Sequence, residues 1–209
     1  PRDKYAATRK LPVRDRLVLM RQVLAAVAHA HRFLVVHRDL KPANILVDAS
    51  GQVKLLDFGI AKLLGDEAQA ESNRDDLTKL GGRVMTLRYA APEQAAEGAI
   101  TTAPDVYALG GILHEFVTGA SPYRAVRERR TFGHAALLQV HIVRPSSLAF
   151  SAEAASERGQ PDARQLARCL VGDLDAILLK ALRREPADRY ASIEQFDEEL
   201  SGPPICVVD

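Results

Sequence analysis

Residues 37–46 read His37-Arg38-Asp39-Leu40-Lys41-Pro42-Ala43-Asn44-Ile45-Leu46, and residues 57–59 read Asp57-Phe58-Gly59. Two short runs rich in aliphatic residues, 45–47 and 53–56, lie between the two motifs and are separated by a Gly-containing turn at 48–51. This pattern predicts a β-hairpin. Because the hairpin folds back on itself, we expect the oxygen-bearing side chains of Asp39, Asn44 and Asp57 to lie along one rim.

The chain around the hairpin has mostly helical periodicity. Apolar residues spaced by three and four predict a helix over 14–31, with Arg14, Arg16 and Arg21 on its solvent side. A second helix follows a capping-box pattern from Thr102 to Asp105 and ends at Gly119. Its apolar residues lie on nearly all faces, so it is expected at the centre of the domain. Further helices are expected over 174–182 and 192–200.

Several stretches carry weaker signals. Residues 65–82 are polar and small, which predicts a long mobile loop of the kind that is often functional. Residues 124–165 are the least legible: 134–143 is a possible helix, and 146–161 reads as a loop. The predicted fold class is therefore α+β, mainly α-helical with one small β-hairpin.

Composition excludes several classes of protein. The 209 residues carry a net charge of +1, which does not favour nucleic-acid or polybasic membrane binding. The hydrophobic share of 47% and the charged share of 26% are typical of a soluble globular protein. No stretch is long and apolar enough to span a membrane. Cys169 and Cys206 form no C-x-x-C pattern, so we expect neither a disulfide scaffold nor a zinc ribbon, and a cytoplasmic location.

A third motif, Ala91-Pro92-Glu93, follows the first two. In this order the three resemble the catalytic loop, the metal-binding motif and the end of the activation segment of protein kinases. The sequences of residues 89–94 and 172–182 are most similar to those of bacterial serine/threonine kinases of the eukaryotic-like type. The resemblance covers about residues 11–200 and implies a kinase-like fold. We expect residues 1–200 to form the C-terminal lobe of the catalytic domain, and 201–209 to be a tail of unclear structure.

The resemblance implies a role for each polar residue of the rim. Asp39 would be the base for the substrate hydroxyl, and Lys41 would neutralise the phosphoryl group in transfer. Asn44 and Asp57 would bind Mg²⁺ or Mn²⁺ together with ATP, in keeping with the preference of these ions for oxygen ligands. Phosphoryl transfer depends on such positioning and charge stabilisation more than on covalent help. The alternative reading is a solvated polar turn on a hairpin.

The same resemblance implies serine/threonine specificity, because Lys41 stands two residues after Asp39 and Thr86 matches the threonine that touches both. Leu87 departs from the family, which often has Pro there. Other supporting roles are implied as well. His37 would hold Asp57-Phe58-Gly59 in place, and Arg38 would meet a phosphate, with Thr78 as the candidate acceptor and Ser72 as the weaker one. Glu93 and Arg189 would form a buried ion pair. Asp105 would brace the catalytic loop, unless it is only a helix cap.

The sequence contains no G-x-G-x-x-G loop and no V-A-I-K-like lysine, which in this family belong to the small N-terminal lobe. Since the chain starts at Pro1 and only 36 residues precede His37, we expect it to be a piece of a longer protein, which could be membrane-tethered elsewhere. Its expected partners are ATP, protein substrates and the missing lobe, and alone it is expected to be inactive. Two functions stay open: part of an active kinase, or a truncated non-catalytic binding module.

Overall fold

The structure is a computed structural model that describes residues 2–57, 89–95, 101–123 and 142–202. The loop expected over 65–82 lies outside these residues, and so does nearly all of the possible helix at 134–143, whose last two residues are not helical. In the described part, no helix is both long enough and apolar enough to cross a membrane.

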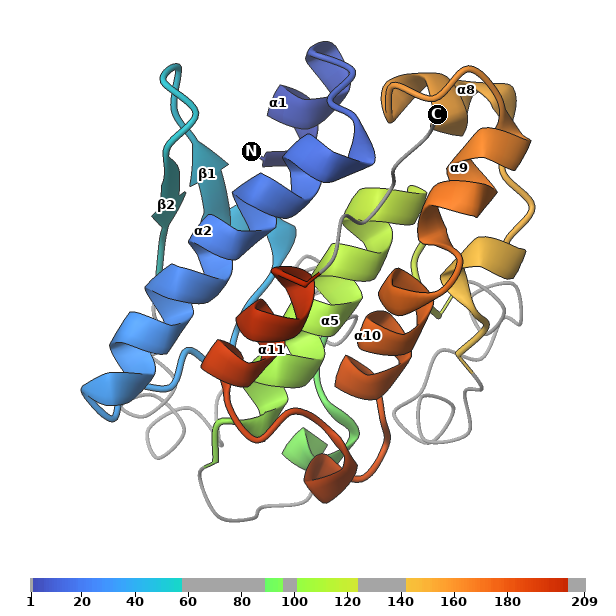
Figure 1. Cartoon of the computed structure of the whole chain (residues 1–209). Helices are drawn as coiled ribbons and strands as arrows, with labels where there is room; N and C mark the ends of the chain where they lie inside the picture. Colours follow the sequence, from blue (N-terminus) through green and yellow to red (C-terminus); the bar gives the residue numbers. More distant parts are fainter. Residues whose placement is uncertain (1, 58–88, 96–100, 124–141, 203–209) are drawn as a thin grey trace, which may run out of the picture.

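Helices dominate the described chain, as expected (Figure 1). They are α1 (Arg2–Thr8), α2 (Val13–Arg32), α5 (Ala103–Thr118), α8 (Ala152–Glu157), α9 (Ala163–Leu170), α10 (Asp173–Ala181) and α11 (Ile193–Leu200). Short 3₁₀ turns lie between them: η1 (Pro42–Asn44), η2 (Pro92–Ala95), η3 (Pro145–Ser147) and η4 (Pro186–Asp188).

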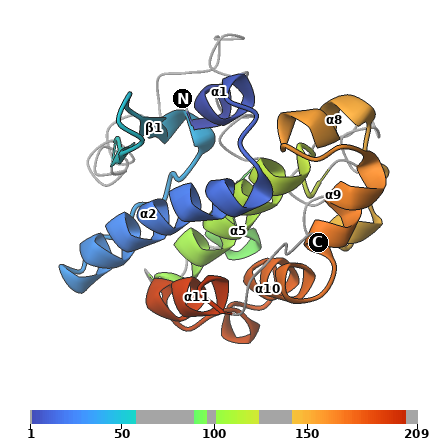
Figure 2. The same ribbon diagram turned by 45° about the horizontal axis from the view of Figure 1, so that its top comes forward.

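The predicted hairpin consists of β1 (Ile45–Val47) and β2 (Val53–Leu55), which pair antiparallel with Ile45 opposite Leu55. The Asp48 carboxylate closes its turn by accepting hydrogen bonds from the backbone N–H groups of Ser50 and Gln52, at 2.9 and 3.1 Å. β2 packs against α2, and β1 contacts α1 (Figure 2). Contacts with both helices thus hold the hairpin in place.

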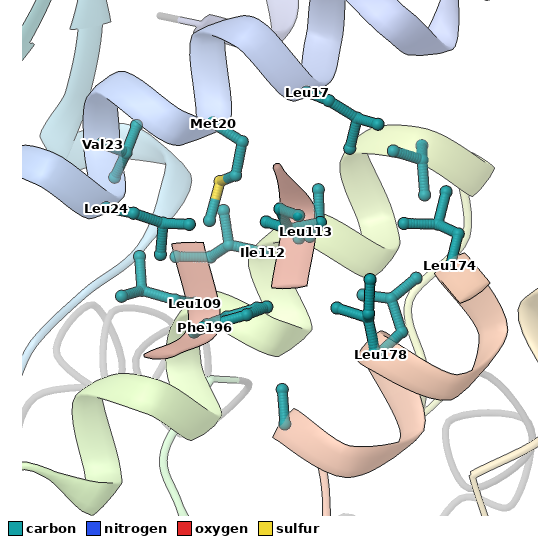
Figure 3. Packing of buried hydrophobic residues seen from close by; sticks show 14 of the residues in the cluster. Leu17, Met20, Val23, Leu24, Leu109, Ile112, Leu113, Leu174, Leu178 and Phe196 are labelled. Carbon is teal, nitrogen blue, oxygen red and sulfur yellow. The ribbon is translucent and has the colours of Figure 1, made fainter. Parts of the chain in front are cut away.

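Helix α5 is buried on nearly all sides and forms the centre of the core, as its sequence predicts. Figure 3 shows Leu109, Ile112 and Leu113 of α5 facing Met20 and Leu24 of α2 and Leu178 of α10. A Cβ on Gly110 would lie 2.8 Å from the Cβ of Ala181, so this close approach of α5 to α10 requires glycine. Gly119 ends α5 with φ +78°, as expected.

Some expectations about these helices are wrong. Arg16 was expected on the solvent side of α2, but it is buried and donates to the backbone carbonyls of Leu11, Phe116 and Glu157 at 2.8, 3.1 and 2.6 Å. The hydrophobic pattern could not reveal this, because the carbonyls come from distant segments. Thr102 makes no side-chain cap at the start of α5.

Residues 146–161 are not a plain loop, because α8 and the last two residues of η3 lie within them. Helices α1 and α9 also had no prediction. For α9 a signal existed: Asp162 caps the helix by accepting from Gln165 N at 2.8 Å, and Asp-x-x-Gln is a capping pattern. Cys169 is buried and disulfide-bonded, contrary to the expected reduced state. Local spacing carries no information about pairing between residues distant in sequence.

Leucine at position 34 is a strained helix stop. Helix α2 ends with Val35 N donating to Ala30 O and Leu34 N donating to His31 O, the bonds of a Schellman motif. Leu34 occupies the left-handed position with φ +60°, and the residue is 92% exposed. A leucine in this conformation costs roughly 1–2 kcal/mol, and glycine adopts it freely.

We therefore expect Leu34→Gly to raise the free energy of unfolding by about 0.5 kcal/mol, after the greater entropy of glycine in the unfolded chain is counted. Phe33→Gly is the matched control, because Phe33 has φ −96° and should lose stability. Urea unfolding measures both. Destabilisation by Leu34→Gly would show that the strain is absent.

His114 is a buried base in α5. Its Nδ1 lies 3.0 Å from the carbonyl oxygen of Ala120, so Nδ1 carries the proton and donates. Burial lowers the pKa of His114 from 6.5 to about 4, against smaller opposing effects of that hydrogen bond and of Asp175. The folded protein therefore keeps the ring neutral at a pH where the unfolded chain protonates it.

The free energy of unfolding should consequently fall by about 3 kcal/mol as the pH drops from 6.5 to 4, because the unfolded chain binds the proton first. Above pH 6.5, His114 should contribute no pH dependence to stability. His114→Asn keeps a donor for the Ala120 carbonyl and should flatten this part of the pH profile. Val18→Asn, at an exposed position of α2 without a titratable group, is the control and should leave the profile unchanged. Equal slopes in the wild type and in His114→Asn would contradict the assignment.

Candidate catalytic loop and its supports

Asp39 and Lys41 face each other at the start of the hairpin. Lys41 Nζ lies 2.7 Å from Asp39 Oδ2, and both side chains are partly accessible to solvent. Turn η1 follows directly, with Pro42 in its first position, and Asn44 N donates to Lys41 O at 3.0 Å. The turn fixes the path of the chain between the two polar residues and β1.

Asn44 connects this loop to the hairpin. Its side chain is buried, and Nδ2 donates to the backbone carbonyl of Asp39 at 3.1 Å. Leu56 N donates to Asn44 O at 2.9 Å, which extends the β1–β2 ladder by one residue. Asp57 follows with φ +50° and an exposed side chain. The segments that carry Asp39, Asn44 and Asp57 therefore meet at one rim, as the hairpin predicts.

Asp105 braces the loop from the first turn of α5. Its Oδ2 accepts from His37 N at 2.8 Å and its Oδ1 accepts from Arg38 N at 2.9 Å. The residue is 1% exposed, so these charge-assisted bonds form away from water. The carboxylate thus points at the loop and does not serve merely as a helix cap.

His31 is a third partner of Asp105 that the sequence analysis missed. Its Nε2 lies 2.8 Å from Asp105 Oδ2, and both side chains are nearly buried. The signal was present, because His31 continues the apolar stripe of α2, where a polar side chain needs a partner.

His37 has no exposed surface, and its Nε2 lies 3.2 Å from the carbonyl oxygen of Leu56. A carbonyl only accepts, so Nε2 is the donor. His37 therefore links the loop to the residue before Asp57. Phe58 and Gly59 themselves lie outside the described residues, as do Thr78, Thr86 and Ser72.

Arg189 and Glu93 form a bidentate ion pair, at 2.6 and 2.7 Å. The Arg189 side chain is fully buried, and its remaining N–H groups donate to the backbone carbonyls of Ala103, Arg183 and Arg184. All five donors of the guanidinium are thereby used. The guanidinium also lies 4.7 Å from the centre of the Tyr107 ring. This pair holds η2 against the start of α5.

Gln94 is a second residue that the sequence analysis missed. It follows Glu93 in η2, and its Nε2 donates to the carbonyl of Arg38 at 3.1 Å. No local pattern marks an exposed glutamine as a partner of a loop 56 residues away.

Among the described residues, no group of three or more His, Cys, Asp or Glu side chains forms a metal cluster.

Arg189→Lys should lower the free energy of unfolding by about 3–5 kcal/mol, because lysine cannot satisfy Glu93 and three carbonyls at once. Arg21→Lys is the matched control. Arg21 pairs with Asp197 at 2.8 Å but is 46% exposed, so its loss should cost at most about 1 kcal/mol. Chemical unfolding compares the two, and equal costs would refute the structural role of Arg189.

The sequence comparisons with known proteins identify one family. The protein kinase domain matches residues 3–198. The serine/threonine-protein kinase PrkC of Bacillus subtilis (strain 168) is 32% identical over 199 residues, which are 95% of this chain and 26% of PrkC. PknH of Mycobacterium tuberculosis (strain ATCC 25618 / H37Rv) is 35% identical over 191 residues, 90% of this chain and 26% of PknH.

PknB of the same strain is 31% identical over 175 residues, 84% of this chain and 24% of PknB. The chain thus spans about a quarter of the length of these relatives. Its helical architecture with a two-stranded hairpin is consistent with the C-terminal lobe of a kinase. The extent of the match establishes that this chain belongs to the protein kinase domain family and is homologous to bacterial serine/threonine kinases.

Proposed function

We propose that this chain supplies the catalytic loop of a protein serine/threonine kinase, with residues 1–200 as the C-terminal lobe and 201–209 as a tail. The observation that carries the proposal is the placement of the Asp39 carboxylate. It stands 2.7 Å from Lys41, on a loop whose backbone N–H groups are held by the buried carboxylate of Asp105. Such fixed positioning is what phosphoryl transfer requires.

In the proposed reaction a serine or threonine hydroxyl oxygen forms a bond to the γ-phosphorus of ATP. The bond from that phosphorus to the β,γ-bridging oxygen breaks, and ADP leaves. Asp39 receives the hydroxyl proton, and Lys41 moves from Asp39 toward the oxygens of the transferring group, whose charge it stabilises. Both roles need side chains that reach solvent, and each is partly exposed.

The residues at the rim fit a magnesium or manganese ion. The Asn44 amide nitrogen is engaged by the Asp39 carbonyl, so its oxygen is the atom that it can offer to a cation. Asp57 directly follows Leu56, whose N–H donates to the Asn44 carbonyl, and it offers an exposed carboxylate. A bound ion would neutralise phosphate charge. Since two protein ligands are few, we expect the ion to bind together with ATP.

Serine/threonine specificity is supported by Lys41 and by the names of the relatives, which are all serine/threonine-protein kinases. Thr86 is the proposed second determinant, and Thr78 is the proposed phosphorylation site whose phosphate Arg38 would bind. A non-catalytic, kinase-like binding module is the alternative. The pairing of Asp39 with Lys41 favours catalysis, since a binding module has no physical need for that arrangement.

The test compares Asp39→Asn with wild type in the natural polypeptide that contains this chain. The variant should lower kcat for a protein substrate by about 10²–10⁴-fold and leave nucleotide binding intact, because it removes only the proton acceptor. Asp15→Asn, at an exposed position of α2, is the control and should be fully active.

Normal turnover by Asp39→Asn would disprove the role of Asp39. Metal-dependent ATP binding without phosphate transfer by the wild type would favour the binding module.

A further inference from the structure

The Gln94 side chain joins two segments that the sequence keeps apart. Its Oε1 accepts from Ala91 N at 2.7 Å, and its Nε2 donates to Arg38 O at 3.1 Å. A backbone N–H only donates and a carbonyl only accepts, so both contacts require the same orientation of the amide. Gln94 thus bridges η2 and the catalytic loop.

The point where it touches the loop is strained. Arg38 has φ +63°, and Asp39 N donates to His37 O at 2.8 Å, which closes a three-residue turn around Arg38. A γ-turn with positive φ is rare and strained, above all for a residue with a long side chain. Such a conformation persists only where the surrounding structure holds it.

The two sides of Arg38 are held by different residues. On the N-terminal side, Asp105 binds the N–H groups of His37 and Arg38. On the C-terminal side, the Arg38 carbonyl belongs to the peptide that leads into Asp39, and Gln94 binds that carbonyl. The direction of this peptide sets where the Asp39 side chain starts. Release of the carbonyl would let the peptide rotate and carry the carboxylate away from Lys41.

We propose that Gln94 is a positioning residue: it locks the Arg38–Asp39 peptide and so aligns the Asp39 carboxylate when η2 is docked. Docking of η2 is in turn secured by the neighbouring Glu93–Arg189 pair. The effect on turnover rests on the proposed kinase function, whereas the lock itself does not.

Two substitutions separate the functions of the amide. Gln94→Glu keeps an acceptor for Ala91 N but removes the donor and places a negative charge against the Arg38 carbonyl. Gln94→Lys keeps a donor for that carbonyl and removes the acceptor. Gln165→Glu, on α9, makes the same amide-to-carboxylate change away from the loop and is the matched control.

The lock is tested on the 209-residue chain by amide hydrogen exchange at Asp39, followed by NMR. Exchange should be about tenfold faster in Gln94→Glu, the factor that corresponds to one ordinary hydrogen bond. It should return close to the wild-type rate in Gln94→Lys and stay at that rate in Gln165→Glu. Unchanged exchange in Gln94→Glu, or equal acceleration in both Gln94 variants, would overturn the proposal.

The consequence is tested in the natural polypeptide that contains the chain. Gln94→Glu should lower kcat about tenfold with KM for ATP unchanged, and Gln94→Lys should recover most of the loss. A fall in thermal stability that fully accounts for the lower kcat would reduce Gln94 to a structural role and refute positioning. If exchange responds as expected but the wild type transfers no phosphate, the proposed function fails and the lock stands.

Discussion

The buried carboxylate of Asp105 is the contact on which the candidate site depends. It stands at the first turn of the central helix and receives two backbone N–H groups of the catalytic loop and the imidazole of His31. A buried carboxylate without partners would be very costly, so its bonds are effectively obligatory. These bonds fix the positions of α5, α2 and the loop relative to one another. The loop that carries Asp39 is therefore held rigidly against the packed core.

Two buried arginines do similar work elsewhere. Arg16 joins the start of α2 to the end of α5 and the end of α8 through backbone carbonyls. Arg189 joins η2 to α5 and to the segment before η4. In both cases the planar guanidinium satisfies several carbonyl groups at the ends of helices or in turns, which apolar side chains could not do. The chain contains no Trp and few aromatic residues, so these polar junctions supplement a core of Leu, Val, Ile and Ala.

The loop is thus held by groups that differ in origin and in exposure. Asp105, His31 and His37 act from the buried side, where each hydrogen bond is shielded from water. Gln94 acts from the exposed side and comes from η2, whose own position depends on Arg189. The buried contacts form with the core itself. The exposed one requires η2 to be docked, so it is the contact best suited to link the state of that segment to the loop.

The sequence by itself was enough to predict the helices α2, α5, α10 and α11 and the β1–β2 hairpin. It also identified the polar residues at the rim of the hairpin. These features rest on local regularities: the spacing of apolar residues, turn residues and short motifs. Tertiary structure alone decided the burial of Arg16, the bond from His31 to Asp105 and the bridge from Gln94 to Arg38. Each of these joins residues brought together only by packing, and a hydrogen bond across the fold leaves no periodic trace in the chain. Helix α8 escaped prediction because it is only six residues long, and a helix that short depends on packing against the rest of the fold even though Ser151 caps it.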